Sequence, residues 1–218
     1  MKTLTIIFIF ISLSIFADGK KDSVLVSLRL ANDSVLENGN HYFEIEDGRT
    51  LEIHTFRIYF KIGSSRRTTE CDTDGYVLLD LNTIQKSIST SKRDLSTIGV
   101  GVDSLCHCSG LMERDLNPRK GMYWSWQSGF INQKIEGFLT DKNGSQQEFV
   151  YHLGGYLRDH LGYFDLTNSE KKDTIEIEID LAQYLNKIFE DSSTLQIMSP
   201  SSGAAHLQKE LSNHTVIN

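Results

Sequence analysis

Residues 175–180 decide the fold, and they read Ile-Glu-Ile-Glu-Ile-Asp. Apolar and acidic residues alternate with a period of two, which is typical of a β-strand that packs one face on a core and exposes the other. Residues 23–30 repeat the pattern, with an apolar residue at every second position from Val24 to Leu30. These two stretches predict strands of a sheet that covers one side of a core.

The same alternation recurs at residues 51–60, 98–102 and 149–153, and residues 76–81 form a denser apolar run. In residues 51–60 the apolar positions change parity after Ile53, which predicts a β-bulge or a bend near His54 and Thr55. Short strands at regular spacing, separated by turn residues, indicate a sandwich of antiparallel strands rather than alternating β-α units.

Two short helical patterns follow near the C-terminus. Apolar residues recur at helical spacing over residues 181–189, and residues 205–211 resemble them after Ser201, Ser202 and Gly203. No stretch of linker residues is long enough to divide the chain into two domains. The prediction is an all-β fold: a single antiparallel β-sandwich domain over residues 18–218, with one or two short helices near the C-terminus.

The first 17 residues differ from the rest of the chain. Lys2 precedes an almost wholly apolar run that ends at Ala17, and this pattern predicts a signal peptide over residues 1–17. No cysteine follows the run, so a lipid anchor has no acceptor. No second apolar stretch exists, which predicts a periplasmic or secreted protein with no membrane span in the mature chain.

The composition narrows the classes of function. The 218 residues are 39% hydrophobic and 23% charged, with a formal net charge of −7, which is ordinary for a globular chain. The acidic balance argues against nucleic acid as a partner. Three cysteines, Cys71, Cys106 and Cys108, leave three interpretations open. Cys71 forms a disulfide with one of the other two, the thiols are simply buried, or the triplet Cys106-His107-Cys108 binds a metal, although it lacks the ligand spacing of a zinc site.

Two stretches carry the candidate site residues. Trp124 and Trp126 lie two residues apart, so both indoles project from one face of a strand, either as core or as the frame of a site. His152 alternates with Tyr151 and Leu153, which places it on the face opposite to these apolar residues. Neutral imidazole is a common ligand for copper and zinc.

Several blocks of the sequence resemble the MbnP-like family of copper-binding proteins associated with methanobactin operons. The most specific is Gly121-Met-Tyr-Trp-Ser-Trp-Gln-Ser-Gly129. The others, in family order, are Thr55-Phe-Arg-Ile-Tyr-Phe60, Gly99-Val-Gly-Val-Asp-Ser104 with Ser109-Gly110, Asp115-Leu-Asn-Pro118, Lys134-Ile-Glu-Gly137, His152-Leu-Gly-Gly-Tyr156 and Ile197-Met-Ser-Pro200.

The resemblance implies an exported β-sandwich that binds copper through two histidines and a tryptophan oxidised to kynurenine by a di-haem partner protein. Carried over to this sequence, Trp124 and Trp126 form the Trp-x-Trp motif, His152 is one metal ligand, and His54 is the first choice for the second. His107 and Gln133 depart from the family pattern. An asparagine or a small polar residue is expected in place of His107, and an aromatic residue in place of Gln133.

The resemblance therefore predicts a non-enzymatic copper-binding protein in copper acquisition or handling. The competing hypothesis is a secreted β-sandwich interaction or adhesion module in which Trp124 and Trp126 are structural core. An enzyme is not expected, because the sequence has no Gly-x-Ser-x-Gly, no His-Glu-x-x-His and no phosphate-binding glycine loop.

Overall fold

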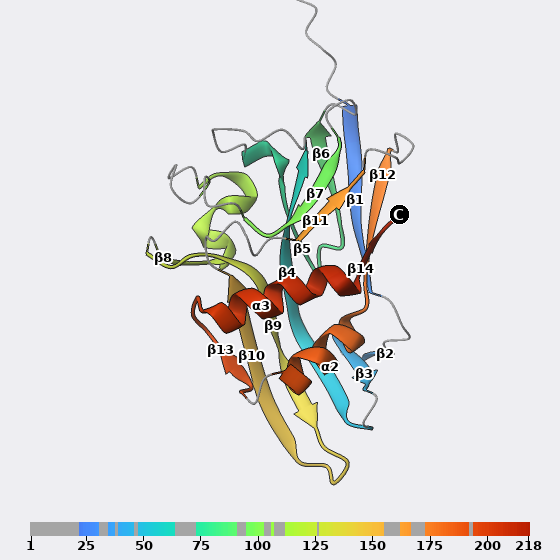
Figure 1. Ribbon diagram of the computed structural model, residues 1–218. Coiled ribbons are helices and arrows are strands. Elements are labelled where there is room, and N and C mark those ends of the chain that lie inside the picture. The colour runs from blue at the N-terminus through green and yellow to red at the C-terminus, as the bar shows by residue number, and fades with distance from the viewer. Residues whose placement is uncertain are drawn as a thin grey trace, which may run out of the picture.

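Two β-sheets form the body of the protein, and two helices pack against the same core (Figure 1). The computed structural model describes residues 22–30, 35–37, 39–45, 48–63, 73–90, 95–102, 106, 112–125, 127–154, 162–166, 173–191 and 194–218. The predicted signal peptide, residues 1–17, lies outside these ranges, and so do Trp126, Cys71, His107 and Cys108.

The strands and helices have the following bounds. The strands are β1 (Asp22–Leu30), β2 (Val35–Glu37), β3 (Asn40–Glu44), β4 (Thr50–Gly63), β5 (Tyr76–Asp80), β6 (Gln85–Thr90), β7 (Thr97–Val100), β8 (Tyr123–Ser125), β9 (Gly129–Thr140), β10 (Gln146–Gly154), β11 (Gly162–Asp165), β12 (Thr174–Ile179), β13 (Gln196–Ile197) and β14 (Thr215–Ile217). The α-helices are α2 (Leu181–Asp191) and α3 (Ser202–Glu210), and 3-10 turns are η1 (Thr73–Gly75), η2 (Arg114–Leu116), η3 (Pro118–Lys120) and η5 (Leu211–His214).

The first sheet has the strand order β14-β12-β1-β6, and the second follows the path β11-β7-β4-β9-β10-β13. On the second sheet β3 and β5 also pair with β4, and β8 pairs with β9. Among the described strands, β1 with β12 and β10 with β13 pair in parallel, and the other pairs are antiparallel. The predicted β-sandwich with short C-terminal helices is confirmed, with these two parallel pairs as an addition.

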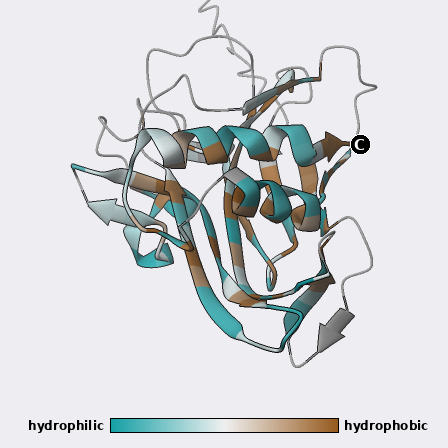
Figure 2. Cartoon of the chain, turned by 60° about the horizontal axis from the view of Figure 1, so that its bottom comes forward, coloured by the Kyte–Doolittle hydropathy of each residue, from teal (hydrophilic) through white to brown (hydrophobic). Residues whose placement is uncertain are grey.

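The main core lies between the sheets and the two helices. Asp180 immediately precedes helix α2, and its Oδ1 accepts a hydrogen bond from the Gln183 backbone N–H at 2.9 Å, which caps the first turn. Its buried residues follow helical spacing: Leu181, Tyr184, Leu185 and Ile188. Figure 2 shows the two helices lying across the strands, with apolar and polar positions alternating along each.

Gln133 is buried in this core between β9 and the helices. Its Oε1 accepts a hydrogen bond from the Tyr184 hydroxyl at 2.7 Å, and its Nε2 donates to the Gln208 carbonyl at 3.0 Å. A buried amide needs such partners, because an unpaired one would lose its hydrogen bonds to water. The departure from the aromatic residue expected here is therefore a polar link that ties β9 to α2 and α3.

The predicted bulge in β4 is confirmed. The register between β4 and β9 shifts between Ile53, which pairs with Gly137, and Thr55, which pairs with Glu136. His54 lies in the shift. Both flanking apolar residues, Ile53 and Phe56, are fully buried in the main core, so the extra residue between them restores the inward direction of the second apolar set.

A second, smaller core lies on the outer face of the second sheet. Its members are Tyr59, Tyr76, Leu78, Val102, Cys106, Leu116, Met122, Phe130 and Ile131, with Trp124 packed against it. Asp115, 5% exposed, anchors the covering segment: its Oδ2 accepts the Leu78 N–H at 2.8 Å, and its carboxylate pairs with Lys86. The Tyr59 hydroxyl donates to the Asp115 carbonyl at 2.7 Å.

Cys106, in the smaller core, is fully buried and disulfide-bonded, which supports the disulfide interpretation over buried thiols.

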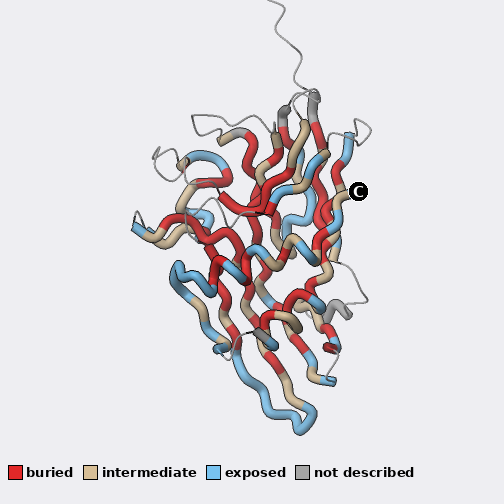
Figure 3. The backbone as a smooth tube through the Cα atoms, viewed as in Figure 1, coloured by how far each residue is buried: buried red, intermediate tan, exposed pale blue. Residues whose placement is uncertain are grey.

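Among the described helices, none has the length and apolar character needed to cross a membrane. Figure 3 shows a long exposed stretch at the turn between β9 and β10.

Candidate metal centre

His152 lies on β10 with its side chain on the outer face of the second sheet. Its neighbours Tyr151 and Leu153 are fully buried in the main core, and alternation along the strand places His152 opposite to them, as predicted. His152 is 9% exposed. The imidazole therefore lies on a strand that pairs with β9 on one side and with the short β13 on the other, and it is largely shielded from water.

The imidazole of His152 contacts a carboxylate on the neighbouring strand. Its Nε2 lies 2.8 Å from Glu136 Oε1, and the same oxygen lies 3.1 Å from Lys134 Nζ. His152 pairs directly with Lys134, and Glu136 pairs with Val150, so His152 and Glu136 are diagonal neighbours on one face. This places the acid within reach of the ring without any loop.

Glu136 is held in its ionised form. Burial alone would raise its pKa, but hydrogen bonds with His152, Lys134 and Thr55, together with the charge of Lys134, outweigh burial and lower the pKa of Glu136. An ionised carboxylate can only accept, so His152 Nε2 donates in this contact, and Nδ1 is the ring nitrogen that a metal ion could use. Metal-binding histidines are oriented in this way, with the remote nitrogen donating to a carboxylate.

The two charged side chains beside His152 have opposite signs. Lys134 pairs directly with His152 across β9 and β10, and its Nζ lies 3.1 Å from Glu136 Oε1. Arg57 and Asp80 form a separate pair farther across the sheet, on β4 and β5, with Arg57 Nε 3.6 Å from Asp80 Oδ2. A metal ion at Nδ1 of His152 would therefore meet no net charge from Lys134 and Glu136.

Substitution of Glu136 by glutamine is expected to weaken the dependence of the free energy of unfolding on pH between pH 6 and pH 3. A carboxylate with a lowered pKa stabilises the fold above its ordinary titration range, and this contribution is lost as pH falls through its folded pKa. The wild-type advantage over Glu136→Gln should shrink as pH falls from 6 to 3, by no more than about 1 kcal/mol because the group is partly exposed. Urea unfolding at each pH measures it.

The control is Glu148→Gln, which removes an exposed carboxylate from the same hairpin. If the Glu136→Gln and wild-type profiles run parallel over this range, the hydrogen bonds do not favour the ionised form of Glu136.

His54 lies apart from His152. It is exposed in the β4 bulge, with Nδ1 3.3 Å from Thr55 Oγ1 and its ring 5.8 Å from that of Phe138. Strand β9 lies between β4 and β10. Two strand spacings and the offset in register separate the Cα atoms of His54 and His152 by about 13 Å. The described geometry does not bring the two predicted histidines together.

Trp124 lies on β8 and packs against the smaller core. Its indole Nε1 is buried and has no hydrogen-bond partner among the described residues. Strand β8 pairs with the start of β9 at Phe130 and Gly129, whereas His152 pairs further along at Lys134. The offset is about 15 Å along the strand, and Trp126 lies outside the described residues.

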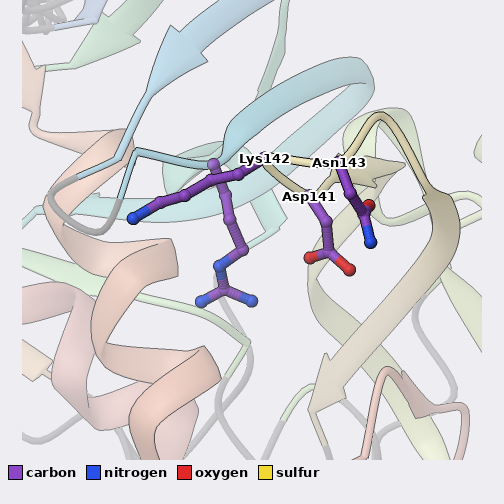
Figure 4. Close-up of a pocket in the computed structure, with 4 residues that line it drawn as sticks. Asp141, Lys142 and Asn143 are labelled. Atoms are coloured by element: carbon purple, nitrogen blue, oxygen red, sulfur yellow. The ribbon is translucent and has the colours of Figure 1, made fainter.

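No group of three histidine, cysteine or acidic side chains that could hold a metal ion is present in the described part of the chain. A hollow of about 380 Å³ lies at the far end of the β9–β10 hairpin and is lined by Arg49, Asp141, Lys142 and Asn143 (Figure 4). Its two cationic side chains make it a poor site for a metal ion, and it does not include His152.

Comparison with known proteins identifies the family. The family model MbnP matches residues 24–199. The chain belongs to the MbnP family. Among solved structures, MbnP from Methylosinus trichosporium is similar, with 14% sequence identity and a TM-score of 0.48, over 81% of this chain and 80% of that chain. A search of curated proteins finds no match.

Two MbnP-like blocks that are distant in sequence are neighbours in this fold. The block Lys134-Ile-Glu-Gly137 lies on β9 and the block His152-Leu-Gly-Gly lies on β10, and Glu136 and His152 form their contact. Glu136 was not among the site residues that the sequence predicted. The available signal was parity: Lys134 and Glu136 alternate with Ile135 and Gly137, which places both charges on one face.

Proposed function

We propose that this protein is an exported copper-binding protein, not an enzyme, that acts in copper acquisition or handling. The MbnP family is associated with methanobactin, which makes copper relevant. His152 is the ligand on which the proposal rests, because its remote nitrogen is already held by Glu136 at 2.8 Å.

The donor chemistry at His152 fits copper. Imidazole nitrogen is a good ligand for copper, whereas calcium and magnesium prefer oxygen ligands. The Glu136 carboxylate increases the basicity of the imidazole and fixes the ring orientation. These features of a ligating histidine are present together on one strand pair.

The second part of the proposal is oxidation of Trp124 or Trp126 to kynurenine by a di-haem partner protein. Indole is a poor ligand, since its nitrogen carries a hydrogen and only donates. Ring opening would supply an aromatic amine and a ketone. The buried and unpartnered Nε1 of Trp124 leaves a polar atom whose burial costs about 1–3 kcal/mol, which a modified side chain could recover.

Export is supported by two features. Residues 1–17 have the pattern of a signal peptide, and the disulfide at Cys106 fits an oxidising compartment.

One observation favours the alternative, a secreted interaction or adhesion module. Trp124 packs against the smaller core beside Tyr123 and Met122, as a purely structural residue would. In that case neither tryptophan would be modified, and the protein would bind no copper.

The experiment that tests the proposal is an intact mass of the protein purified from its native host, with peptide mapping across residues 121–137 and a parallel copper assay. Stoichiometric copper with a kynurenine mass on one tryptophan supports both parts. Bound copper together with unmodified tryptophans would support the histidine site and contradict the kynurenine ligand. Neither copper nor modification supports the interaction module.

The variants Trp124→Phe and Trp126→Phe are expected to differ, because only one tryptophan is modified. In protein from the native host, one variant should lose the kynurenine mass and about tenfold or more in copper affinity, as expected for loss of a ligand, and the other should keep both. Peptide mass and chelator competition measure the two effects. Equal behaviour of the variants, with no mass change in either, would favour the core hypothesis.

A further inference from the structure

The segment after β13 runs beside His152. Strand β13 pairs in parallel with β10, with Val150 opposite Gln196 and Tyr151 opposite Ile197. The Val150 N–H donates to the Leu195 carbonyl at 2.8 Å, which anchors this short pair. The residues that follow Tyr151 and Ile197 are His152 and Met198. Figure 1 shows β13 beside β10.

Met198 is the first residue after β13, as His152 is the first residue of β10 after the paired Tyr151. Tyr151 and Ile197 both pack against the main core, and extended backbone for one more residue would turn Met198 to the outer face, where His152 lies. Met198 is 57% exposed, whereas the His152 side chain is 11% exposed. An exposed thioether therefore follows β13, the strand that pairs with β10 just before its shielded imidazole.

The backbone of Met198 is held on both sides. The β13 pair ends at Ile197, and Ser201 begins α3 by accepting a hydrogen bond from the Ala204 N–H at 3.0 Å. Pro200 stands between these anchors and restricts the backbone further. The position of Met198 along β10 is therefore set by the fold, although its side chain faces solvent.

We propose that the Met198 thioether and Nδ1 of His152 together bind Cu(I). The inference rests on the proposed copper function and names the second donor at the same histidine. Thioether sulfur is a soft ligand that selects Cu(I) over harder divalent ions. Neither donor would add a negative charge, and the charges of Lys134 and Glu136 beside His152 are opposite, so the site suits a monovalent ion better than a divalent one.

Met198 follows the strand next to β10, whereas the other predicted ligands, His54 and Trp124, lie far from His152. His54 is two strands away on the other side of β9, and Trp124 pairs with the far end of β9. Strand β10, which carries His152, pairs with β9 on one side and with β13 on the other. Among the described residues, Met198 is the soft donor that the strand register brings to this edge.

The test uses Met198→Leu, which removes sulfur at nearly constant volume, with Met112→Leu as the matched control. Met112 packs against the smaller core, away from β10. We expect Met198→Leu to lose about tenfold or more in Cu(I) affinity, measured by competition with a Cu(I) chelator, and Met112→Leu to match wild type. Cu(II) affinity should change little.

A second measurement distinguishes methionine from the cysteines. In protein labelled with selenomethionine, copper-edge X-ray absorption should show a selenium neighbour in wild type and none in Met198→Leu. Unchanged Cu(I) affinity in Met198→Leu, with no selenium neighbour in wild type, would overturn the Met198 site while His152-dependent copper binding kept the proposed function. Cu(I) binding that persists in His152→Ala would overturn the two-donor site. Absence of copper binding in wild type would overturn both proposals.

Discussion

Replacement of His152 by alanine is expected to weaken copper binding by about tenfold or more and to leave the protein folded. The ring contributes the nitrogen donor, and its Nε2 lies 2.8 Å from Glu136 Oε1. Without the ring, Glu136 keeps Lys134, 3.1 Å away, so no unpaired buried charge is created. Chelator competition measures the affinity, and circular dichroism checks the fold.

Two other histidines provide comparisons. His206 is exposed on α3, so His206→Ala should bind copper as wild type does. His54→Ala tests the second predicted ligand: given the separation between the two histidines, it should cost less than His152→Ala. Unchanged copper affinity in His152→Ala would remove His152 from the site, and an equal loss in His54→Ala would mean that the metal-bound protein brings the two strands' histidines together.

Replacement of Gly137 by alanine is expected to destabilise the protein by about 3 kcal/mol or more. A Cβ atom at this position would lie 2.0 Å from the Glu52 carbonyl oxygen and 2.8 Å from the Phe149 ring. The backbone of β4 cannot move away without breaking the pairing around the His54 bulge. Urea unfolding measures the loss, and a marginally stable domain would be largely unfolded by it.

The matched control is Gly63→Ala at the end of β4. A Cβ atom there meets nothing within 4 Å, so its free energy of unfolding should stay within about 0.5 kcal/mol of wild type. If Gly137→Ala is as stable as Gly63→Ala, β4 and β9 are not as close at the bulge as the structure places them.

Much of the fold follows from local pattern. The alternation in residues 175–179 predicts β12, and the change of parity after Ile53 predicts the bulge. Helical spacing predicts α2, where Asp180 supplies the cap. These features depend on the period of apolar residues over a few positions, so one sequence is enough to find them.

Strand order could not be read in the same way. Strand β1 pairs in parallel with β12, a partner about 150 residues later in the chain, and no local pattern encodes such a choice. The parallel pair of β10 with the two-residue β13 is too short to leave a periodic signal. Both depend on how the whole chain closes around the core.

By itself, the sequence determined the β-sandwich class, the outward face of His152, the bulge at His54 and the resemblance to MbnP. Each is a matter of residue type and spacing along a strand. Only the tertiary structure decided that Glu136 holds His152, that His54 lies two strands away, and that the chain after β13 brings Met198 to the same edge. These facts depend on register and strand order, and a slip of one residue would reverse every face.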